Sequence, residues 1–208
     1  MDRSSQAVSI FNKKADQYFE KFMDQNEYLE EIKKFLETLP SKNPKVLDVA
    51  CGPGNLSKLI LDQNPRIELI GIDLSENMIS LAKKNNPDSI FKIMDIRNLN
   101  KIKEVFDGIV CGFGIPYLDR NETELFINNC YKKLKANGIL YLSYIEGDPK
   151  NSGYFKGSDG SDDDMFINYH EFNFISKLLK ENNFKLIKTS TQIIDENNKN
   201  TIIISQKF

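Results

Sequence analysis

The spacing of apolar and polar residues divides the chain into a helical start and a longer mixed region. Up to about residue 40, apolar side chains such as Ile32 and Phe35 recur at three- and four-residue intervals, which predicts helices until Pro40 ends the pattern. Beyond Pro44, short apolar runs alternate with amphipathic stretches. This alternation of strands and helices indicates a parallel sheet that helices cover on both faces.

The expected elements follow this rhythm as far as residue 145. Strands are expected at 45–50, 67–72, 90–94, 106–111 and 138–145, and helices at 55–63, 76–85, 99–104 and 121–136. A polar loop over about 146–170 follows, then a helix over 170–182 and two strand-like runs, 184–192 and 200–207, with turn-forming residues between them. Because a hairpin joins antiparallel strands, we expect one reversed strand at the end of the sheet.

Length and composition favour one domain over residues 1–208, with a helical cap over 1–43 and an α/β core over 44–208. A chain of 208 residues can form one well-packed core, and 28% charged with 40% hydrophobic residues is typical of a soluble globular protein. The N-terminus lacks the apolar centre of a signal peptide, and no window has the length of a membrane span. These features predict a cytoplasmic protein that does not contact membranes.

The cysteines and the net charge exclude several classes of function. Cys51, Cys111 and Cys130 are odd in number and lie in apolar contexts, which suits reduced thiols in the cytosol, and Cys51 and Cys111 are interpreted as small core residues. With one histidine, no Cys and His cluster has the spacing of metal ligands, so no metal site is expected. A net charge of −2 provides no general attraction to nucleic acid.

A glycine-rich turn follows the first expected strand, in the stretch VLDVACGPGNLS over 46–57. Gly52 and Gly54 permit a tight turn, and the following helix presents unpaired backbone N–H groups to a ligand. Asp73 ends the next strand, 19 residues beyond Gly54, where an acidic side chain accepts hydrogen bonds from ribose in doubly wound folds. Alternatively, the turn is only a tight connection and Asp73 is a helix cap, a role that Ser75 could also fill.

The turn departs from the dinucleotide-binding pattern. Ser57 occupies the third glycine position, Asp48 lies just ahead of the turn, and Lys58 is the only basic side chain close in sequence. A pyrophosphate is disfavoured beside a carboxylate and needs close packing of helix on strand. The pattern therefore favours a nucleoside with a cationic end, and it disfavours a nicotinamide-dependent dehydrogenase.

These motifs resemble those of the class I S-adenosylmethionine-dependent methyltransferases, from about residue 45 to the end. VLDVACGPGNLS resembles the first motif of that family, GIDLSENMI the second and KIMDIRNL the third, while FDGIVCGFGIPYLD stands in the place of the fourth and GILYLSYIEG resembles the fifth strand. The N-terminal FNKKADQY resembles the lead-in segment of many small-molecule members. The resemblance implies an α/β fold with a Rossmann-like, doubly wound, mostly parallel sheet of seven strands, the last of them antiparallel.

The resemblance also implies the cofactor S-adenosyl-L-methionine and assigns residues to its parts. Asp73 would accept from the ribose, Asp95 would accept from the adenine amino group, and Ile96 would pack on the ring. Asp48 would orient the turn or reach the ammonium group through water. The full expected set, including main-chain groups beside the methionine portion and the sulfonium, is Tyr18, Asp48, Ala50, Gly52, Gly54, Asp73, Leu74, Met78, Asp95, Ile96, Cys111, Gly112 and Phe113.

The substrate-side residues are less constrained by pattern. Tyr117 follows the fourth strand at the carboxyl edge, where ligands bind, and it is a candidate catalytic residue. His170 begins a helix and could act as a general base, or it could be a surface histidine, the reading that we favour. Tyr18 could fold over the methionine end or be an ordinary core tyrosine. The run 162–164, three aspartates, is either a solvated loop, the reading that we favour, or a lid that attracts a cationic acceptor.

The predicted activity is methyl transfer from S-adenosylmethionine to a small-molecule acceptor, whose pocket the 1–40 helices and the 146–170 loop would build. Gly114 begins a Gly-Ile-Pro-Tyr run that lacks the amide or carboxylate with which methylases of nucleic-acid amino groups grip their base, so a polynucleotide acceptor is not expected. The alternative is a non-catalytic binding or regulatory protein that keeps the cofactor site. The sequence indicates neither the accepting atom nor the oligomeric state.

Overall fold

The computed structural model describes residues 3–22, 26–156, 164–196 and 198–208. Its strands are β1 (Lys45–Val49), β2 (Glu68–Asp73), β3 (Ile90–Ile93), β4 (Phe106–Gly112), β5 (Leu134–Glu146), β6 (Gly153–Lys156), β7 (Asp164–Ile167), β8 (Phe184–Ile193) and β9 (Lys199–Lys207). The α-helices are α1 (Arg3–Lys13), α2 (Ala15–Phe22), α3 (Leu29–Thr38), α4 (Asn55–Gln63), α5 (Glu76–Asn85), α6 (Arg120–Lys133) and α7 (Phe172–Glu181). Short 3-10 helices are η1 (Asn26–Tyr28), η2 (Ile96–Lys101), η3 (Ile115–Tyr117) and η4 (Pro149–Asn151).

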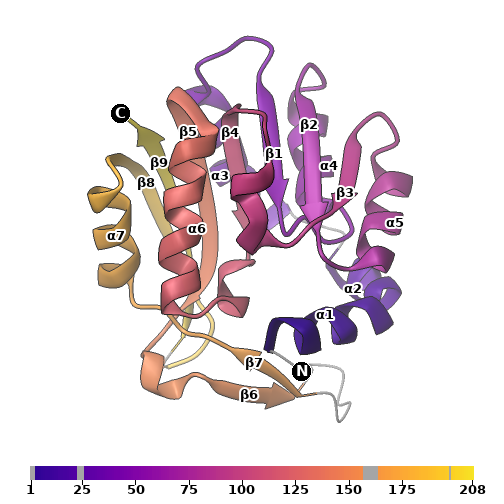
Figure 1. Cartoon of the computed structure of the whole chain (residues 1–208), viewed down its shortest axis with the longest axis vertical. Coiled ribbons are helices and arrows are strands. Elements are labelled where there is room, and N and C mark those ends of the chain that lie inside the picture. The colour runs from indigo at the N-terminus through magenta and orange to yellow at the C-terminus, as the bar shows by residue number, and fades with distance from the viewer. Residues whose placement is uncertain (1–2, 23–25, 157–163, 197) are drawn as a thin grey trace.

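The centre of the molecule is a seven-stranded sheet with the order β3-β2-β1-β4-β5-β9-β8 (Figure 1). Strands β1 to β5 pair in parallel, and β9 runs antiparallel between β5 and β8. The strand order reverses between β1 and β4, and ligands of open α/β sheets bind at such a switch point, beyond the carboxyl ends of the strands. The fold class predicted from the sequence, with its reversed strand, is confirmed.

Helices cover both faces of the sheet, which explains why most residues of the central strands are apolar. Alternate side chains of β1 point to opposite faces: Leu47 and Val49 belong to the core under α6 and α7, whereas Val46 belongs to the core under α3, α4 and α5. Figure 1 shows α6 and α7 on the viewer's side of the sheet, with α3 and α4 behind it.

Helices α1 and α2 lie apart from these layers, below the carboxyl ends of β1 and β2, with the β6–β7 ribbon beside them (Figure 1). Helix α1 contacts α5, η3 and β7. The Gln6 side chain donates a hydrogen bond from Nε2 to the main-chain oxygen of Asp164, at 3.1 Å. The N-terminal helices therefore cover the edge of the sheet where a ligand is expected.

Three elements differ from the sequence prediction. The helix expected at 99–104 is the 3-10 helix η2, which begins at Ile96 because the Asp95 side chain caps it by accepting from the backbone N–H of Arg97. Residues 134–136, expected in a helix, belong to β5. The segment 146–170, expected to be a polar loop, contains the ribbon β6–β7, whose strands of four residues are too short for a clear alternation pattern.

Helix α3, which we expected within the helical cap, packs into the core. Phe35 is fully buried, its ring lies 6.2 Å from that of Tyr141 in an edge-on contact, and a Cβ at Gly108 would lie only 2.6 Å from it. A side chain at Gly108 would therefore displace α3 from the sheet. Only α1 and α2 remain as a cover for the carboxyl edge.

We expect Phe35→Ala to lower the free energy of unfolding by about 3–5 kcal/mol, the usual cost of removing a buried phenylalanine from a core. Urea unfolding followed by circular dichroism measures this change. The matched control is Ile193→Ala, at a side chain that is 81% exposed, which we expect to change the free energy by less than about 0.5 kcal/mol. A loss below about 1 kcal/mol for Phe35→Ala would show that α3 is not part of the core.

Candidate functional site

The candidate site begins with two turns whose backbone lies in the left-handed region. Ala50 and Gly52, just after β1, have φ of 55° and 53°, and Phe113, just after β4, has φ of 55°. Residues with a side chain rarely adopt such angles. Strained backbone of this kind concentrates at functional sites. Since β1 and β4 are the strands at which the sheet order reverses, both strained turns lie at the switch point.

Asp73 joins the turn after β1 to the turn after β2. Its Oδ2 accepts from the backbone N–H of Gly52 at 2.9 Å, and its Oδ1 accepts from the N–H of Ser75 at 2.9 Å. The N-cap of α5 is Ser75, whose Oγ accepts from the N–H of Met78. The alternative that Asp73 is the cap of this helix is therefore wrong, and Asp73 remains at the end of β2 facing a cavity.

Two adjoining cavities occupy the space between the carboxyl edge and the N-terminal helices. The larger has a volume of about 130 Å³ and the smaller about 60 Å³. The larger is lined by Ala7, Val8, Phe11, Tyr18, Ala50, Gly52, Asp73, Leu74, Met78, Met94, Asp95, Ile96, Gly112, Phe113, Gly114, Tyr117 and Leu118. The smaller is lined by Tyr18, Tyr28, Asp48, Ala50, Cys51, Gly52, Pro53, Asn55, Leu56, Gly112, Phe113, Tyr141 and Ser143.

Helix α1 is fastened over the larger cavity by Asn12. Its Oδ1 accepts from Ser75 Oγ and from the backbone N–H of Asn77, both at 2.9 Å, and its main-chain oxygen accepts from Asn77 Nδ2 at 2.7 Å. The N–H of Asn77 is one of the groups that the first turn of a helix leaves unpaired, so Asn12 supplies a partner from another element.

The smaller cavity contains a buried acid and an unsatisfied acceptor. Asp48 is 1% exposed and accepts from Ser57 Oγ at 2.6 Å. Burial, with a smaller contribution from the charge of Asp73, raises the pKa of Asp48 to about 7, against the lowering effect of the Ser57 hydrogen bond. Asn55 is 7% exposed, and its Oδ1 has no hydrogen-bond partner within the described residues. Both side chains suit a ligand that brings N–H donors.

Phenol groups at the cavities stay protonated at neutral pH. Burial, followed by the charge of Asp73, raises the pKa of Tyr18 to about 12, and burial likewise raises the pKa of Tyr117. The Phe11 ring contacts both, with centroid distances of 5.7 Å to Tyr18 and 5.3 Å to Tyr117. These phenols can donate hydrogen bonds, but they are poor bases at neutral pH.

Most of the residues predicted from the sequence line these cavities. They are Tyr18, Asp48, Ala50, Gly52, Asp73, Leu74, Met78, Asp95, Ile96, Gly112, Phe113 and Tyr117. Gly54, Cys111 and His170 line neither cavity. Gly54 packs on α5 instead, where a Cβ would lie 2.6 Å from Asn86 Nδ2, and Cys111 is fully buried in the core between sheet and helices.

The location of His170 differs from both readings of the sequence. The side chain is 1% exposed, so the surface histidine is wrong, and its Nε2 lies 3.2 Å from the main-chain oxygen of Leu118 and 3.4 Å from Thr123 Oγ1. Its ring stacks on Phe174 at 5.7 Å, and burial lowers the pKa of the imidazole. His170 connects Leu118 and the start of α6 to the end of β5, and it lies behind Leu118 rather than in the lining of either cavity, so the geometry does not support a general base there.

Several lining residues were missed by the sequence reasoning. Val8 and Phe11 reach the cavity from α1, and Tyr28, Asn55 and Tyr141 reach the smaller one from three other elements. Asn55 had a detectable signal, because a polar first residue after a glycine turn faces the same ligand as the turn. The remaining four are apolar or aromatic residues at helix or strand spacing, which sequence alone assigns to the core. Of the aspartates at 162–164, only Asp164 lies within the described residues.

Comparison with known proteins agrees with this geometry. Residues 46–138 match the family model described as a methyltransferase domain. Demethylmenaquinone methyltransferase of Thermotoga maritima is 33% identical over 127 residues, which are 60% of this chain and 53% of that protein. The ubiquinone biosynthesis O-methyltransferase of Coxiella burnetii is 30% identical over 118 residues, 55% of this chain and 49% of that protein. The chain thus spans about half the length of these relatives.

Solved structures share the fold over nearly the whole chain. Magnesium protoporphyrin IX methyltransferase of Synechocystis, solved with S-adenosylhomocysteine, has a TM-score of 0.73 at 16% identity, and the match covers 100% of both chains. An S-adenosylmethionine-dependent methyltransferase of Clostridium acetobutylicum has a TM-score of 0.70 at 18% identity, covering 95% of this chain and 99% of that one. The fold implied by the motifs is confirmed, because the chain shares it with these solved structures, and residues 46–138 are similar to the methyltransferase-domain family.

Each helix in the described part of the chain is too short or too polar to cross a membrane. The same residues include no group of three or more His, Cys, Asp or Glu side chains arranged to hold a metal ion. The site is therefore described by its cavities, its strained turns and its buried acids.

The pKa of Asp48 makes stability depend on pH in a defined direction. Its folded value of about 7 lies above its ordinary value of 3.8, so the folded state keeps a proton that the unfolded chain releases, and stability falls as pH rises between these values. We expect Asp48→Asn to remove this fall, which chemical unfolding at about pH 5 and about pH 8 measures. Asp62→Asn, the same change at an exposed site on α4, should show the same dependence of stability on pH as wild type. Parallel pH profiles for wild type and Asp48→Asn would contradict the raised pKa.

Proposed function

We propose that the protein is a methyltransferase that moves a methyl group from S-adenosyl-L-methionine to a small-molecule acceptor. The observation that carries the proposal is the assembly of the four motifs around one pair of cavities. Asp48, Asp73, Asp95 and Phe113 each come from a different one of these segments, yet all of them line these cavities. The methyltransferase-domain match over 46–138 and the relatives support it further.

We assign the two cavities to the two ends of this cofactor. The larger, mostly apolar cavity would take the adenosine, with Asp73 as the ribose acceptor and Leu74, Met78 and Ile96 beside the base. The smaller would take the amino-acid end, where the unpaired Asn55 Oδ1 and the Asp48 carboxyl offer acceptors to an ammonium group. Gly112 and Phe113 line both cavities, which suits contacts to the sulfonium between the two ends.

The chemistry required of the protein is mainly positioning. Bound S-adenosylmethionine supplies a methyl group already activated by a sulfonium leaving group, so the chain has to align the acceptor and exclude water. Tyr117 and Phe11 lie at the larger cavity, and we assign Tyr117 to orienting the acceptor as a hydrogen-bond donor, because its pKa is raised. We assign no general base to His170, which lies outside both cavities. An acceptor that ionises by itself, or needs no deprotonation, suits this site.

The surroundings of the cavity support a small acceptor rather than a polynucleotide. Its opening is covered by the apolar face of α1, where Ala7, Val8 and Phe11 contribute lining atoms. Two relatives have names that refer to small molecules, a demethylmenaquinone methyltransferase and a ubiquinone biosynthesis O-methyltransferase. We also propose a cytoplasmic location without contact to membrane or nucleic acid, in keeping with a net charge of −2 and three free cysteines that are all buried.

Cofactor binding gives the first test. We expect calorimetric titration to show S-adenosylhomocysteine binding and no binding of NAD. Asp73→Asn should weaken the binding of S-adenosylhomocysteine by about 1–3 kcal/mol. The substitution removes a charged hydrogen-bond acceptor and also weakens the contact with the Gly52 N–H. Asp62→Asn on the exposed face of α4 is the matched control and should bind as wild type does. Tight NAD binding without S-adenosylhomocysteine binding would contradict the proposed cofactor.

Methyl transfer itself separates the enzyme from a non-catalytic binding protein of the same fold. We expect labelled methyl from S-adenosylmethionine to appear in at least one member of a panel of small phenols, carboxylates and amines. Tyr117→Phe should bind S-adenosylhomocysteine within about twofold of wild type while its turnover falls about tenfold, the loss expected for one positioning hydrogen bond. Cofactor binding with no transfer across the panel would favour the binding-protein alternative.

A further inference from the structure

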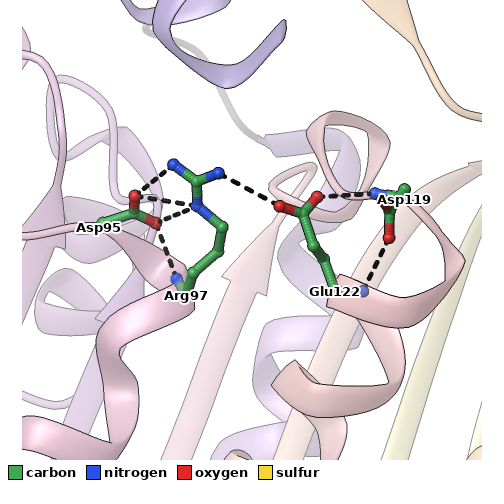
Figure 2. Close-up of polar contacts among 4 residues, drawn as sticks. All are labelled: Asp95, Arg97, Asp119 and Glu122. Carbon is green, nitrogen blue, oxygen red and sulfur yellow. Dashed lines mark hydrogen bonds and ion pairs between the residues drawn. The ribbon is translucent and has the colours of Figure 1, made fainter. Parts of the chain in front are cut away.

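Arg97 joins two carboxylates on opposite sides of a gap between η2 and α6 (Figure 2). Its Nη2 donates to Asp95 Oδ2 at 2.6 Å, and its Nε lies 3.0 Å from Asp95 Oδ1 and 2.9 Å from Oδ2. Its Nη1 donates to Glu122 Oε1 at 3.2 Å. The side chains of Asp95, Arg97 and Glu122 are 15%, 28% and 29% exposed, so this network is shielded more than an ordinary surface ion pair.

The far end of the network is anchored to the start of α6. Glu122 Oε2 accepts from the backbone N–H of Asp119 at 3.0 Å, while Asp119 Oδ1 accepts from the N–H of Glu122 at 2.8 Å. This reciprocal pair is a capping box, which fixes both side chains at the N-terminus of the helix. Glu122 therefore holds Arg97 from a rigid element, and Arg97 in turn is fixed relative to Asp95.

The Asp95 carboxylate has few acceptor positions left. Three donors of Arg97 reach it: the backbone N–H, which is 2.8 Å from Oδ1, the Nε that both oxygens share, and Nη2. A carboxylate offers about four acceptor positions, so about one remains. Asp95 lines the larger cavity, whereas Arg97 does not. A ligand in the larger cavity therefore meets a carboxylate whose orientation is set by the three donors from Arg97.

We propose that Arg97 is a positioning residue that orients the Asp95 carboxylate toward the 6-amino group of the adenine and thereby makes the site selective for adenine over a 6-oxo purine. This inference rests on the proposed function, since it assumes an adenosyl ligand in the larger cavity. A 6-amino group donates a hydrogen bond to the fixed oxygen, whereas a 6-oxo group presents a second acceptor there. Sites that hydrogen-bond a ligand group strongly reject analogues that leave buried polar atoms unpaired.

The alternative role for Arg97 is purely structural, as a tie between η2 and α6. Both roles predict some loss of stability when Arg97 is changed, so unfolding measurements alone do not separate them. The separating readout is base selectivity, the ratio of the dissociation constant of S-inosylhomocysteine to that of S-adenosylhomocysteine. A tie between two elements would leave this ratio unchanged, because both ligands would lose affinity together.

The experiment measures that ratio by calorimetry for wild type and four variants. We expect wild type to favour the adenine ligand by at least about tenfold, and Arg97→Gln and Asp95→Asn each to reduce the ratio by about tenfold, the effect of one charged hydrogen bond. Arg97→Lys retains a charge but not the paired N–H donors, so its ratio should lie between that of wild type and that of Arg97→Gln. Combining Arg97→Gln with Asp95→Asn should add little, because both act on the same contact.

The matched control is Lys58→Gln, which breaks an ion pair on α4 between Lys58 Nζ and Asp62 Oδ1, 3.0 Å apart. Neither residue lines either cavity. Its ratio should equal that of wild type. An unchanged ratio in Arg97→Gln, with wild type binding S-adenosylhomocysteine, would overturn the proposal for Arg97 alone. Absence of S-adenosylhomocysteine binding in wild type would instead overturn the proposed function. Should Arg97→Gln not fold, Arg97→Lys decides: a reduced ratio supports the proposal and a wild-type ratio overturns it.

Discussion

The two hydrogen bonds that Asp73 accepts are the constraint on which the rest of the site depends. One comes from the turn after β1 and the other from the turn after β2, so one carboxylate sets the distance between two strand ends. The parallel register that pairs Val49 with Ile72 brings these turns together. Burial raises the pKa of Asp73, which shows that the fold keeps an acid there at a cost in solvation. That cost is consistent with a group retained to bind a ligand.

The cavities lie between a floor of strand ends and a cover of N-terminal helices. The floor consists of strand ends and strained turns within the sheet, where Ala50 and Phe113 have left-handed backbones. The cover consists of α1 and α2, which rest on α5 mainly through Asn12 and contribute apolar atoms to the larger cavity. The network around Arg97 extends the floor to the adenine side, because it connects η2 to the capping box of α6.

The sequence could predict what depends on local pattern. Strand ends, the glycine turn and the aspartates at 48 and 73 follow from periodicity and motif spacing, Asp95 follows from the resemblance to the family, and all three aspartates line the cavities as expected. Contacts between distant segments were not predictable. Arg97 looks like a solvated charge in a helix until α6 brings Glu122 beside it, and His170 looks like an exposed helix start until Phe174 and Leu118 enclose it. The β6–β7 ribbon was missed for the same reason, because its two short strands are recognisable as strands only through their pairing with each other.

Hydrogen–deuterium exchange with and without S-adenosylhomocysteine tests most directly whether the covered cavities are the cofactor site. The account predicts slower exchange of amides in 50–56 and 95–101, and in α1, because the ligand contacts the turns and stabilises the closed position of the cover. Exchange elsewhere, for example in α7 on the outer face of the sheet, should stay unchanged. Protection confined to a different surface, or no protection of α1 and the turns at saturating ligand, would contradict the account.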